Sequence, residues 1–308
     1  MKERTFVITG GNSGLGYQCA KNIAIENDGN HVIIACRNVE KSKQSAATLL
    51  VETGNPHLYV LPLDLASPAS VREFCRTLAG MDLPPLYGLV CNAIAGSSAM
   101  KYTADGIEQT FGVGHLGHFL LANILSTTMC DGGRIVFVSS DQHNPPKILG
   151  KLIYTDALDL AHPPQPVSHA MRYSATKLCN LYCTYQMAER IKSETDKRIT
   201  VNAFNPGFMA DTGLSGNAKG FAERLAKNVA PLLARLLGTH SNAEKSGQLL
   251  ASLMTGAQWE DVTGKYFDRN RERPSSELSR NRANSENLWK RSIELVALQQ
   301  HETIYKFK

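Results

Sequence analysis

A tyrosine and a lysine four residues apart, Tyr173 and Lys177, are the side chains of this sequence best suited to acid–base chemistry. Residues at this spacing share one face of a helix, so the ammonium group would stand beside the phenol. A phenol titrates near ~10 in water, and a neighbouring ammonium lowers that pKa. Ser140 follows a strongly apolar run and could hold a substrate oxygen in place. A tyrosine–lysine pair alone is a common accident, so its meaning depends on the rest of the chain.

A glycine-rich stretch near the start of the chain, residues 9–16, is typical of a site for a nucleotide pyrophosphate. A short β-branched run precedes it and a helical apolar spacing follows it. Glycines let the backbone turn tightly beside the phosphates, and the helix N-terminus offers free N–H groups. Glycine motifs alone are weak evidence, because tight turns of any kind use glycine. The expected cofactor contacts here are Gly10, Asn12, Ser13, Gly14, Leu15 and Gly16.

Arg37 stands at the end of the second predicted strand, where dinucleotide folds bind the adenine ribose. An acidic residue there would accept hydrogen bonds from the ribose hydroxyls, whereas arginine suits a 2′-phosphate. The sequence therefore predicts NADP(H) as the cofactor. The third and fourth strands end in further candidates for cofactor contacts, at the edge where open α/β sheets bind their ligands: Asp64, Leu65, Asn92 and Ala93.

These residues need a framework, and strand and helix patterns alternate along the chain to supply one. Apolar β-branched runs predict strands at 5–8, 31–35, 58–61, 86–91, 134–138, 199–204 and 265–267. Helical spacing predicts helices from the glycine stretch to about 28, at 40–52, after Ser67, and at 103–129, 170–193, 241–254 and 284–300. The expected fold is α/β: one domain over residues 1–308 with a Rossmann-like, doubly wound parallel sheet of about seven strands and helices on both faces.

Two irregular segments interrupt this alternation. The proline-rich insertion at 141–169 is too long for an ordinary connection, and such segments are usually functional. The second segment, 207–238, contains a helical stretch at 221–237 whose leucine stripe either packs on the core or binds an apolar substrate or a membrane surface. Both are expected on the substrate side, and residues 275–308 are expected to form a helical tail.

Composition narrows the classes of partner. The formal charge of +5 is modest, and the arginine-rich stretch at 269–291 favours a solvated arm over a nucleic-acid site. His115 and His118 lack further ligands at metal spacing, which favours structural roles and no bound metal. The first strand begins directly after residue 4, leaving no room for a signal peptide, and no apolar run reaches the length of a membrane span. These features predict a cytoplasmic protein, and they leave open whether it forms oligomers. Five cysteines fall in apolar patterns and are predicted to be buried and reduced: Cys19, Cys75, Cys91, Cys179 and Cys183.

Taken together and in order, these motifs resemble those of the short-chain dehydrogenase/reductases. The matching residues are Thr9-Gly10-x-x-x-Gly14-x-Gly16, Asp64-Leu65, Asn92-Ala93, Ser140, Tyr173-x-x-x-Lys177 and Asn205-Pro206-Gly207. The resemblance implies hydride transfer between a nicotinamide and a carbonyl or alcohol. It makes Tyr173 the proton donor in reduction and Ser140 the group that orients the carbonyl oxygen. Lys177 would bind the nicotinamide ribose and lower the tyrosine pKa, while three further residues contact the cofactor: Pro206, Gly207 and Thr212.

Within that family the chain is similar to the branch of retinol dehydrogenases and light-dependent protochlorophyllide reductases. The shared stretches are Ala35-Cys36-Arg37, residues 63–67, residues 115–121 and the long spacer between Ser140 and Tyr173. The protochlorophyllide enzymes carry a cysteine where this chain has Phe208, which argues against pigment photoreduction.

Three positions depart from the family pattern. Gly114 replaces an asparagine that helps a proton relay, Ile94 replaces a glycine beside the cofactor, and Asp211 replaces a threonine. We expect a water molecule to fill the space beside Gly114 and to bridge Lys177 to the glycine carbonyl.

The sequence therefore predicts an NADPH-dependent reductase of ketones or aldehydes, acting on a bulky apolar small molecule through Ser140, Tyr173 and Lys177. One alternative is a C=C reductase similar to the protochlorophyllide enzymes. The other is a catalytically weakened relative that binds the nucleotide and serves as a sensor or scaffold.

Overall fold

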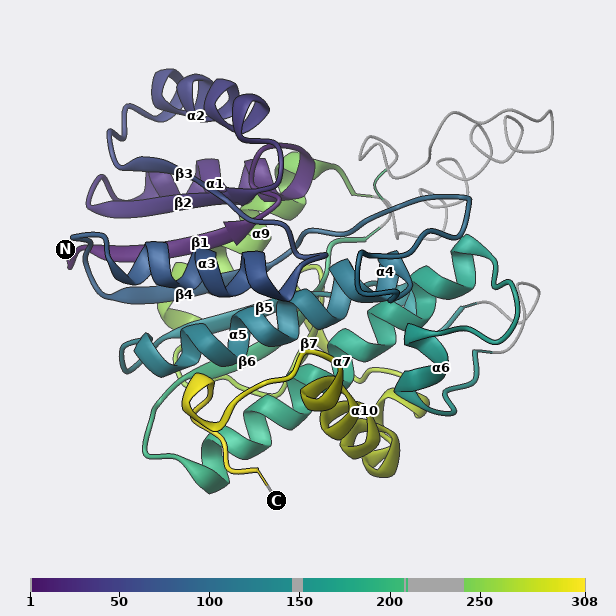
Figure 1. The fold of residues 1–308 in the computed structure, drawn as a ribbon. Helices are drawn as coiled ribbons and strands as arrows, with labels where there is room; N and C mark the ends of the chain where they lie inside the picture. The colour runs from purple at the N-terminus through teal and green to yellow at the C-terminus, as the bar shows by residue number, and fades with distance from the viewer. Residues whose placement is uncertain (1, 146–151, 208, 210–240, 308) are drawn as a thin grey trace.

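The computed structural model describes residues 2–145, 152–207, 209 and 241–307. Its centre is an eight-stranded sheet in the order β3-β2-β1-β4-β5-β6-β7-β8 (Figure 1). The strands are β1 (Arg4–Thr9), β2 (Asn30–Cys36), β3 (Leu58–Pro62), β4 (Leu86–Cys91), β5 (Arg134–Val138), β6 (Thr200–Asn205), β7 (Tyr266–Asp268) and β8 (Arg271–Arg273). The first seven pair in parallel and β8 pairs antiparallel with β7. Strand order reverses between β1 and β4, which is the arrangement of a doubly wound sheet.

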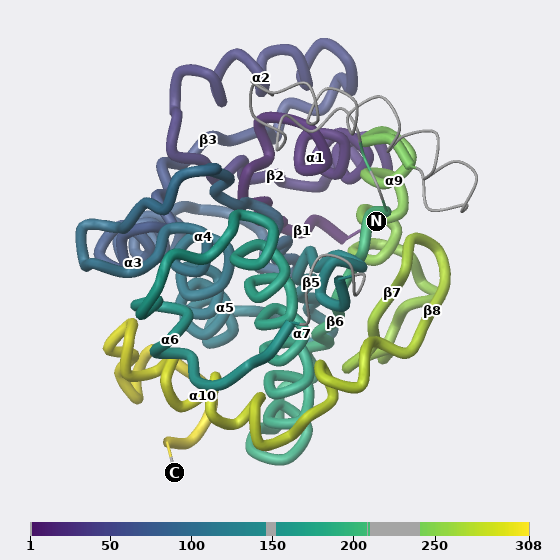
Figure 2. The backbone as a smooth tube through the Cα atoms, turned by 90° about the vertical axis from the view of Figure 1, so that its right-hand side faces the viewer, coloured from purple at the N-terminus to yellow at the C-terminus, as the bar shows by residue number. Residues whose placement is uncertain are grey.

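Helices cover both faces of this sheet (Figures 1 and 2). Phe6 and Ile8 of β1 pack in one core with α1 (Gly14–Glu26), α2 (Val39–Thr53) and α9 (Ala243–Thr255). Val7, on the opposite side of the same strand, packs in the other core with α3 (Pro68–Ala79), α5 (Gly117–Thr128) and α7 (His169–Glu194). The period-two alternation of one buried strand therefore serves two helical layers.

The C-terminal tail packs against α5 and α7. It contains the turn η5 (Leu278–Arg280), the helix α10 (Arg282–Leu295) and the turn η6 (Gln300–Glu302). The Trp289 ring of α10 lies edge-on to Phe119 of α5, with centroids 5.0 Å apart, and edge-on to Tyr305, at 5.3 Å. The Tyr182 hydroxyl of α7 donates to the Leu278 carbonyl at 2.8 Å. The tail is therefore a packed part of the fold, as the apolar spacing at 284–300 predicts.

All seven predicted strands are confirmed, and the doubly wound parallel fold with them. The expected helix at 103–129 begins only at residue 109 and has three pieces: α4 (Gln109–Phe111), a π-helical turn η1 (Gly112–Leu116) and α5. Ser67 caps α3 by accepting from the Ser70 amide, as expected. The insertion forms the turn η2 (Asp141–His143) and the short helix α6 (Ala157–Ala161) within its described residues.

Several predictions fall on residues that the structure does not describe: Phe208, Asp211, Thr212 and the helix at 221–237.

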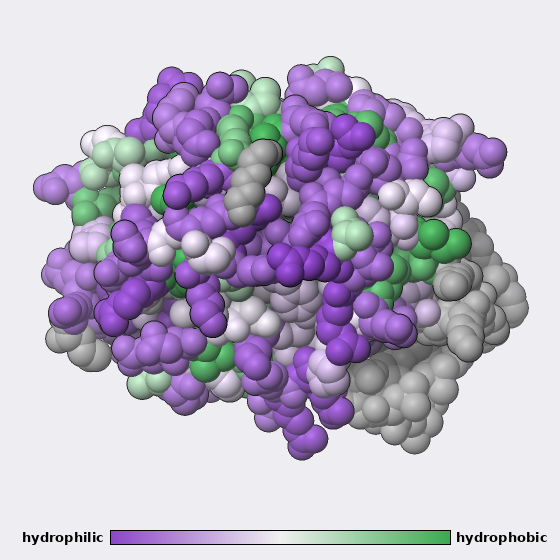
Figure 3. Space-filling model, turned by 90° about the horizontal axis from the view of Figure 1, so that it is seen from below, coloured by the Kyte–Doolittle hydropathy of each residue, from purple (hydrophilic) through white to green (hydrophobic). Residues whose placement is uncertain are grey.

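The five cysteines expected to be buried are buried. Among the described helices, none combines the length and apolar character needed to cross a bilayer. The face on the side of the C-terminal tail is mostly hydrophilic, with scattered hydrophobic residues (Figure 3).

Candidate active site

The sequence-predicted site residues that the structure describes gather at one edge of the sheet, where the parallel strands end. Each follows its own strand: Gly10 after β1, Arg37 after β2, Asp64 after β3, Asn92 after β4, Ser140 after β5 and Pro206 after β6. Tyr173 and Lys177 lie in the first turns of α7. Because the strand order reverses between β1 and β4, ligands of such a sheet bind at this edge.

The glycine stretch forms a tight turn from β1 into α1. Gly10 and Gly14 have positive φ angles of 66° and 55°, which side-chain-bearing residues rarely adopt. A Cβ on Gly16 would lie 2.5 Å from the Gly10 carbonyl oxygen, so only glycine permits this approach of helix to turn. Asn92, at the end of β4, holds the start of this turn, because its Nδ2 donates to the Thr9 carbonyl at 2.9 Å.

The N-terminus of α1 lacks a side-chain cap, as does that of α5, which continues directly from the π-helical turn. Ser13, the N-cap of α1, makes no side-chain capping hydrogen bond. The N-cap side chains of α2, α3, α7, α9 and α10 all accept a backbone N–H. A Cβ on Gly14 would meet nothing within 4 Å, so the first turn of α1 faces open space. The donor groups at this helix end therefore stand ready for an anionic ligand.

Arg37 and Asp64 flank this turn. Arg37 is exposed at the end of β2, and no ion pair of its guanidinium occurs within the described part of the chain. Asp64 is locally engaged, because its Oδ1 accepts from the Ala66 amide at 3.0 Å. Arg37 is thus the charged side chain of this edge that remains available to a phosphate.

The structure brings Ser140, Tyr173 and Lys177 together. Ser140 is 8% exposed and its side chain lies within hydrogen-bonding range of the Tyr173 phenol, where it favours the phenolate. The Lys177 Nζ is 5.4 Å from the centre of the Tyr173 ring and donates to the Val138 carbonyl at 2.8 Å. The hydroxyl, phenol and ammonium groups therefore form one cluster at the end of β5.

The electrostatics of this cluster differ from the sequence-based expectation. Burial raises the pKa of Tyr173 to about 12, opposed by Ser140, while the Asp141 charge raises it further. Burial also lowers the pKa of Lys177 to about 7. Lys177 is not among the groups that shift the Tyr173 pKa, so the expected lowering of that pKa by the lysine is not seen. Tyr173 is protonated at neutral pH.

Asp141 is a site residue that the sequence analysis missed. The Ser140 hydroxyl donates to its Oδ1 at 3.1 Å, and the Ser140 Oγ also accepts from the Gln142 amide at 3.2 Å. The carboxylate thus faces both the serine and the tyrosine. Its position directly after Ser140 was the available signal, since a charge next to a reactive group perturbs that group.

The space beside Gly114 is already occupied by protein. A Cβ at this position would lie 2.6 Å from Thr176 Cγ2 and 3.4 Å from the Ile94 side chain. The Gly114 carbonyl accepts from His118 Nδ1 at 3.2 Å. Protein atoms therefore take up the space at the Cβ position of residue 114, while the expected water bridge from Lys177 to the Gly114 carbonyl stays a prediction. Two neighbouring side chains fill that volume, and the π-helical turn provides the bend.

His118 and His115 both have protein partners. With its Nδ1 proton donated to Gly114, the His118 Nε2 accepts from the Thr9 hydroxyl, 2.8 Å away. The His115 Nε2 lies 3.1 Å from the Ser292 Oγ of α10. Burial lowers both pKa values, to about 4 for His118 and about 3 for His115. Both rings are therefore neutral structural links, and no cluster of three metal-ligating side chains occurs among the residues described.

A buried ion pair, also missed from the sequence, involves Arg172, the residue directly before the candidate catalytic tyrosine. Arg172 Nε lies 3.0 Å from Glu108 Oε1, and both side chains are at most 4% exposed. Arg172 also donates to the Ser97 and Ala99 carbonyls, at 2.7 and 3.2 Å. The pair thereby joins the loop after β4 to the start of α7. Sequence spacing gave no signal, because the two charges come from elements 64 positions apart.

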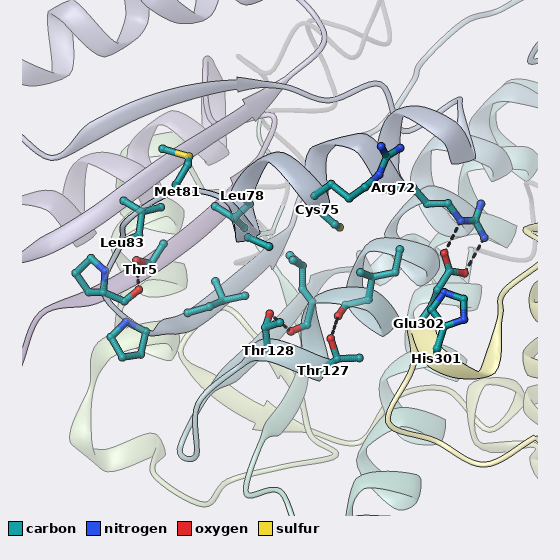
Figure 4. A pocket seen from close by; sticks show the side chains of 17 residues that line it. Thr5, Arg72, Cys75, Leu78, Met81, Leu83, Thr127, Thr128, His301 and Glu302 are labelled. Atoms are coloured by element: carbon teal, nitrogen blue, oxygen red, sulfur yellow. Dashed lines mark hydrogen bonds and ion pairs between the residues drawn. The ribbon is translucent and has the colours of Figure 1, made fainter.

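Two of the cavities formed by the described residues lie at opposite ends of the strands. One of about 340 Å³ is polar, and its wall includes Asp141, the residue after Ser140, together with Asn205, Tyr266, Asp268, Arg269 and Arg273. The other, of about 560 Å³, lies between α3 and α5 near the amino ends of β1 and β4 (Figure 4). There Arg72 and Glu302 form an ion pair at 2.6 Å that ties the tail to α3. Of these two cavities, the smaller has the neighbour of Ser140 in its wall.

Comparison with known sequences gives consistent matches. The family model described as short chain dehydrogenase matches residues 4–152. A WW domain-containing oxidoreductase of Danio rerio is 37% identical over 217 residues, covering 70% of this chain and 51% of the relative. Retinol dehydrogenase 13 of Mus musculus is 32% identical over 303 residues, covering 96% and 84%. The chain thus spans about half of the first relative and most of the second.

Solved structures agree in fold. A putative uncharacterised protein from Mycobacterium Paratuberculosis superimposes with a TM-score of 0.71 at 25% identity, over 97% of this chain and 95% of that one. A blue fluorescent protein from a metagenomic library, solved in complex with NADPH, gives 0.65 at 23% identity, over 86% and 96%. With its strand order, its site and these relatives, the chain belongs to the short-chain dehydrogenases, in the branch that contains the retinol dehydrogenases.

Proposed function

We propose that this protein is an NADP(H)-dependent oxidoreductase that transfers a hydride to a ketone or aldehyde, with Ser140, Tyr173 and Lys177 as its catalytic residues. The observation that carries the proposal is the cluster at the end of β5, where a protonated phenol lies beside the Ser140 hydroxyl and above Lys177. A phenol kept neutral at pH 7 is a proton donor, which is the role that carbonyl reduction requires.

The cofactor proposal rests on three features of the strand ends. The turn at residues 10–16 leaves open space at an uncapped helix N-terminus, which suits a pyrophosphate. Arg37 presents a positive charge where a 2′-phosphate would lie, favouring NADP(H) over NAD(H). The residues that would hold the cofactor are Gly10, Asn12, Ser13, Gly14, Leu15, Gly16, Arg37, Asp64, Leu65, Asn92, Ala93, Tyr173, Lys177, Pro206, Gly207 and Thr212.

When bound, the nicotinamide supplies the hydride. The Ser140 hydroxyl holds the carbonyl oxygen, and the phenolic proton of Tyr173 moves to that oxygen as negative charge develops on it. Lys177, whose pKa burial lowers to about 7, would hold the nicotinamide ribose, the role that the family resemblance implies for it. In alcohol oxidation the same groups act in reverse.

The substrate proposal is a bulky molecule with a large apolar part and a polar reacting end. The similarity to retinol dehydrogenase 13 supports the apolar part. The polar cavity next to Asp141 supports the polar end, because burying its charged side chains against apolar groups would cost free energy. The expected apolar walls at 207–238 lie mostly outside the described residues.

A second candidate is a nucleotide-binding protein with weak turnover. One observation favours it: the Ser140 hydroxyl donates its proton to Asp141, so it is engaged by protein rather than free for a substrate oxygen. NADPH consumption with a panel of bulky and small carbonyl compounds, run in the dark, separates the candidates. The reductase proposal predicts turnover that is faster for bulky aromatic or polycyclic ketones than for acetone. Tight NADPH binding with no turnover of any compound would favour the sensor or scaffold, and turnover of protochlorophyllide only in the light would favour the C=C reductase. Cytoplasmic localisation stays a prediction.

A further inference from the structure

One buried histidine, His143, connects the catalytic serine to the C-terminal tail. It ends the turn η2 and is 4% exposed. Its Nδ1 lies 2.6 Å from the Ser140 carbonyl oxygen, and the Ser276 amide donates to its Nε2 at 3.1 Å. These two contacts join segments 133 positions apart in the sequence.

The direction of both hydrogen bonds follows from the partners. A carbonyl only accepts and a backbone amide only donates, so the ring carries its proton on Nδ1 and a lone pair on Nε2. A doubly protonated ring would face the Ser276 N–H with a second N–H. Burial lowers the pKa of His143, which keeps the ring neutral. The ring also stands edge-on to Tyr266, with centroids 5.2 Å apart.

The tail end of this bridge is itself fixed to the helix that carries Tyr173. The Tyr185 hydroxyl, on α7, donates to the Ser275 Oγ at 2.6 Å. Ser275 is 6% exposed and also accepts from the Ser279 hydroxyl at 2.7 Å. A continuous path therefore runs from α7 through Tyr185, residues 275–276 and the His143 ring to the Ser140 backbone. Tyr173 lies 12 positions earlier on the same helix, so the path connects Ser140 to the helix that carries Tyr173.

We propose that His143 is a positioning residue that sets the distance between Ser140 and Tyr173 by tying Ser140 to α7 through the tail. The Ser140 carbonyl accepts both the His143 ring proton and the His143 amide, at 2.6 and 3.1 Å, and these bonds hold the extended backbone that presents the Ser140 hydroxyl. The tail, beyond the part that the family model matches, thereby becomes part of the catalytic unit. This inference rests on the proposed function, since it assumes that Ser140 and Tyr173 act on one substrate.

Three variants test the path at different links. His143→Leu removes both hydrogen bonds, His143→Asn keeps an amide donor for the Ser140 carbonyl, and Tyr185→Phe removes only the link between α7 and the tail. The matched control is Ser285→Ala, which removes a buried hydrogen bond between the tail and Gln186 of α7 that leads nowhere near Ser140.

We expect His143→Leu to lower kcat by about tenfold to a hundredfold, the range that follows from a small displacement of a reacting group. His143→Asn should recover part of that loss, Tyr185→Phe should lower kcat by a smaller factor, and NADPH affinity should stay unchanged in all variants. Ser285→Ala should leave kcat unchanged. Wild-type kcat in His143→Leu, or Tyr185→Phe behaving like the control, would overturn the proposal.

Nitrogen-15 NMR of the histidine rings provides a readout that needs neither substrate nor cofactor. The His143 ring, assigned by its loss in His143→Asn, should show the Nδ1–H form from neutral pH upward. An Nε2–H form would overturn the bridge even in a fully active enzyme. Absence of carbonyl turnover in the wild type together with an Nδ1–H ring would instead count against the proposed function.

Discussion

The contact between Gly114 and Thr176 gives a prediction whose size can be worked from the structure. A Cβ built on Gly114 would stand 2.6 Å from Thr176 Cγ2, well inside the 3.4–4 Å of ordinary van der Waals contact. Overpacking of this kind in a close-packed core costs about 1–3 kcal/mol. Thr176→Ser removes the obstructing methyl, which by itself costs about 0.8 kcal/mol of stability through lost apolar burial. It keeps the hydroxyl that donates to the Arg172 carbonyl at 2.9 Å.

We therefore expect Gly114→Ala to destabilise the protein, and Thr176→Ser to relieve most of that loss in the double variant. The coupling free energy between the two substitutions should be about 1–2 kcal/mol in the stabilising direction. Urea unfolding of the wild type, both single variants and the double variant measures it, provided that the m-values agree. Additive effects, within about 0.5 kcal/mol, would refute the steric account.

The same geometry governs activity. Gly114→Asn restores the family residue, yet it must push Thr176 away next to Lys177, so we expect kcat to fall. In the Thr176→Ser background the fall should be smaller. An increase in kcat from Gly114→Asn alone would contradict this, and would show that the glycine only removes a residue of the proton relay.

Three further predictions concern charges at the site. Arg37→Ala should reduce the preference for NADPH over NADH by about tenfold or more, since a charge-assisted contact contributes about 1.5–3 kcal/mol; fluorescence titration of both cofactors measures this, and an intact preference would contradict it. Asp141→Asn removes a charge that raises the pKa of Tyr173, so the alkaline limb of the pH–rate profile should move to lower pH; an unmoved limb would remove Asp141 from the site. Because burial lowers the folded-state pKa of Lys177 from 10.5 to about 7, the unfolded chain binds more protons between these values and this residue makes stability rise with pH across that window. Lys177→Met should therefore raise Tm near neutral pH and flatten the rise while abolishing turnover, and a lower Tm would contradict the burial argument.

Much of the fold followed from local pattern. The parallel strands are buried on both faces, so they read as continuous apolar runs that a sequence displays directly. β8 has the opposite character, because Arg271–Arg273 is an exposed, charged edge strand held by pairing with β7. The late start of the helix expected at 103 reflects the turn at Gly106, with its φ of 76°. A charged edge strand and a single glycine turn have no hydrophobic periodicity, so a sequence pattern cannot predict them.

The site divides in the same way. Tyr173 and Lys177 share one helix, and Ser140 ends a strand, so their meeting could be predicted from spacing and topology. The side chains that tune them come from distant elements: Glu108 pairs with Arg172 across 64 positions, and Ser276 meets His143 across 133. The packing of Thr176 and Ile94 against Gly114 could not be predicted for the same reason. Which atoms fill a missing side chain depends on packing between three elements, and no single segment encodes it.

The central claim is that the Tyr173 phenol delivers the proton when NADPH reduces a carbonyl at this site. The direct measurement is the rate of NADPH-dependent product formation by the wild type and by Tyr173→Phe, with NADPH affinity determined for both proteins by fluorescence. Phenylalanine keeps the ring and its packing and removes only the hydroxyl. The account predicts unchanged NADPH affinity and a rate reduced by about 10²-fold or more, the contribution of a positioned proton donor. Equal rates in the two proteins would contradict it.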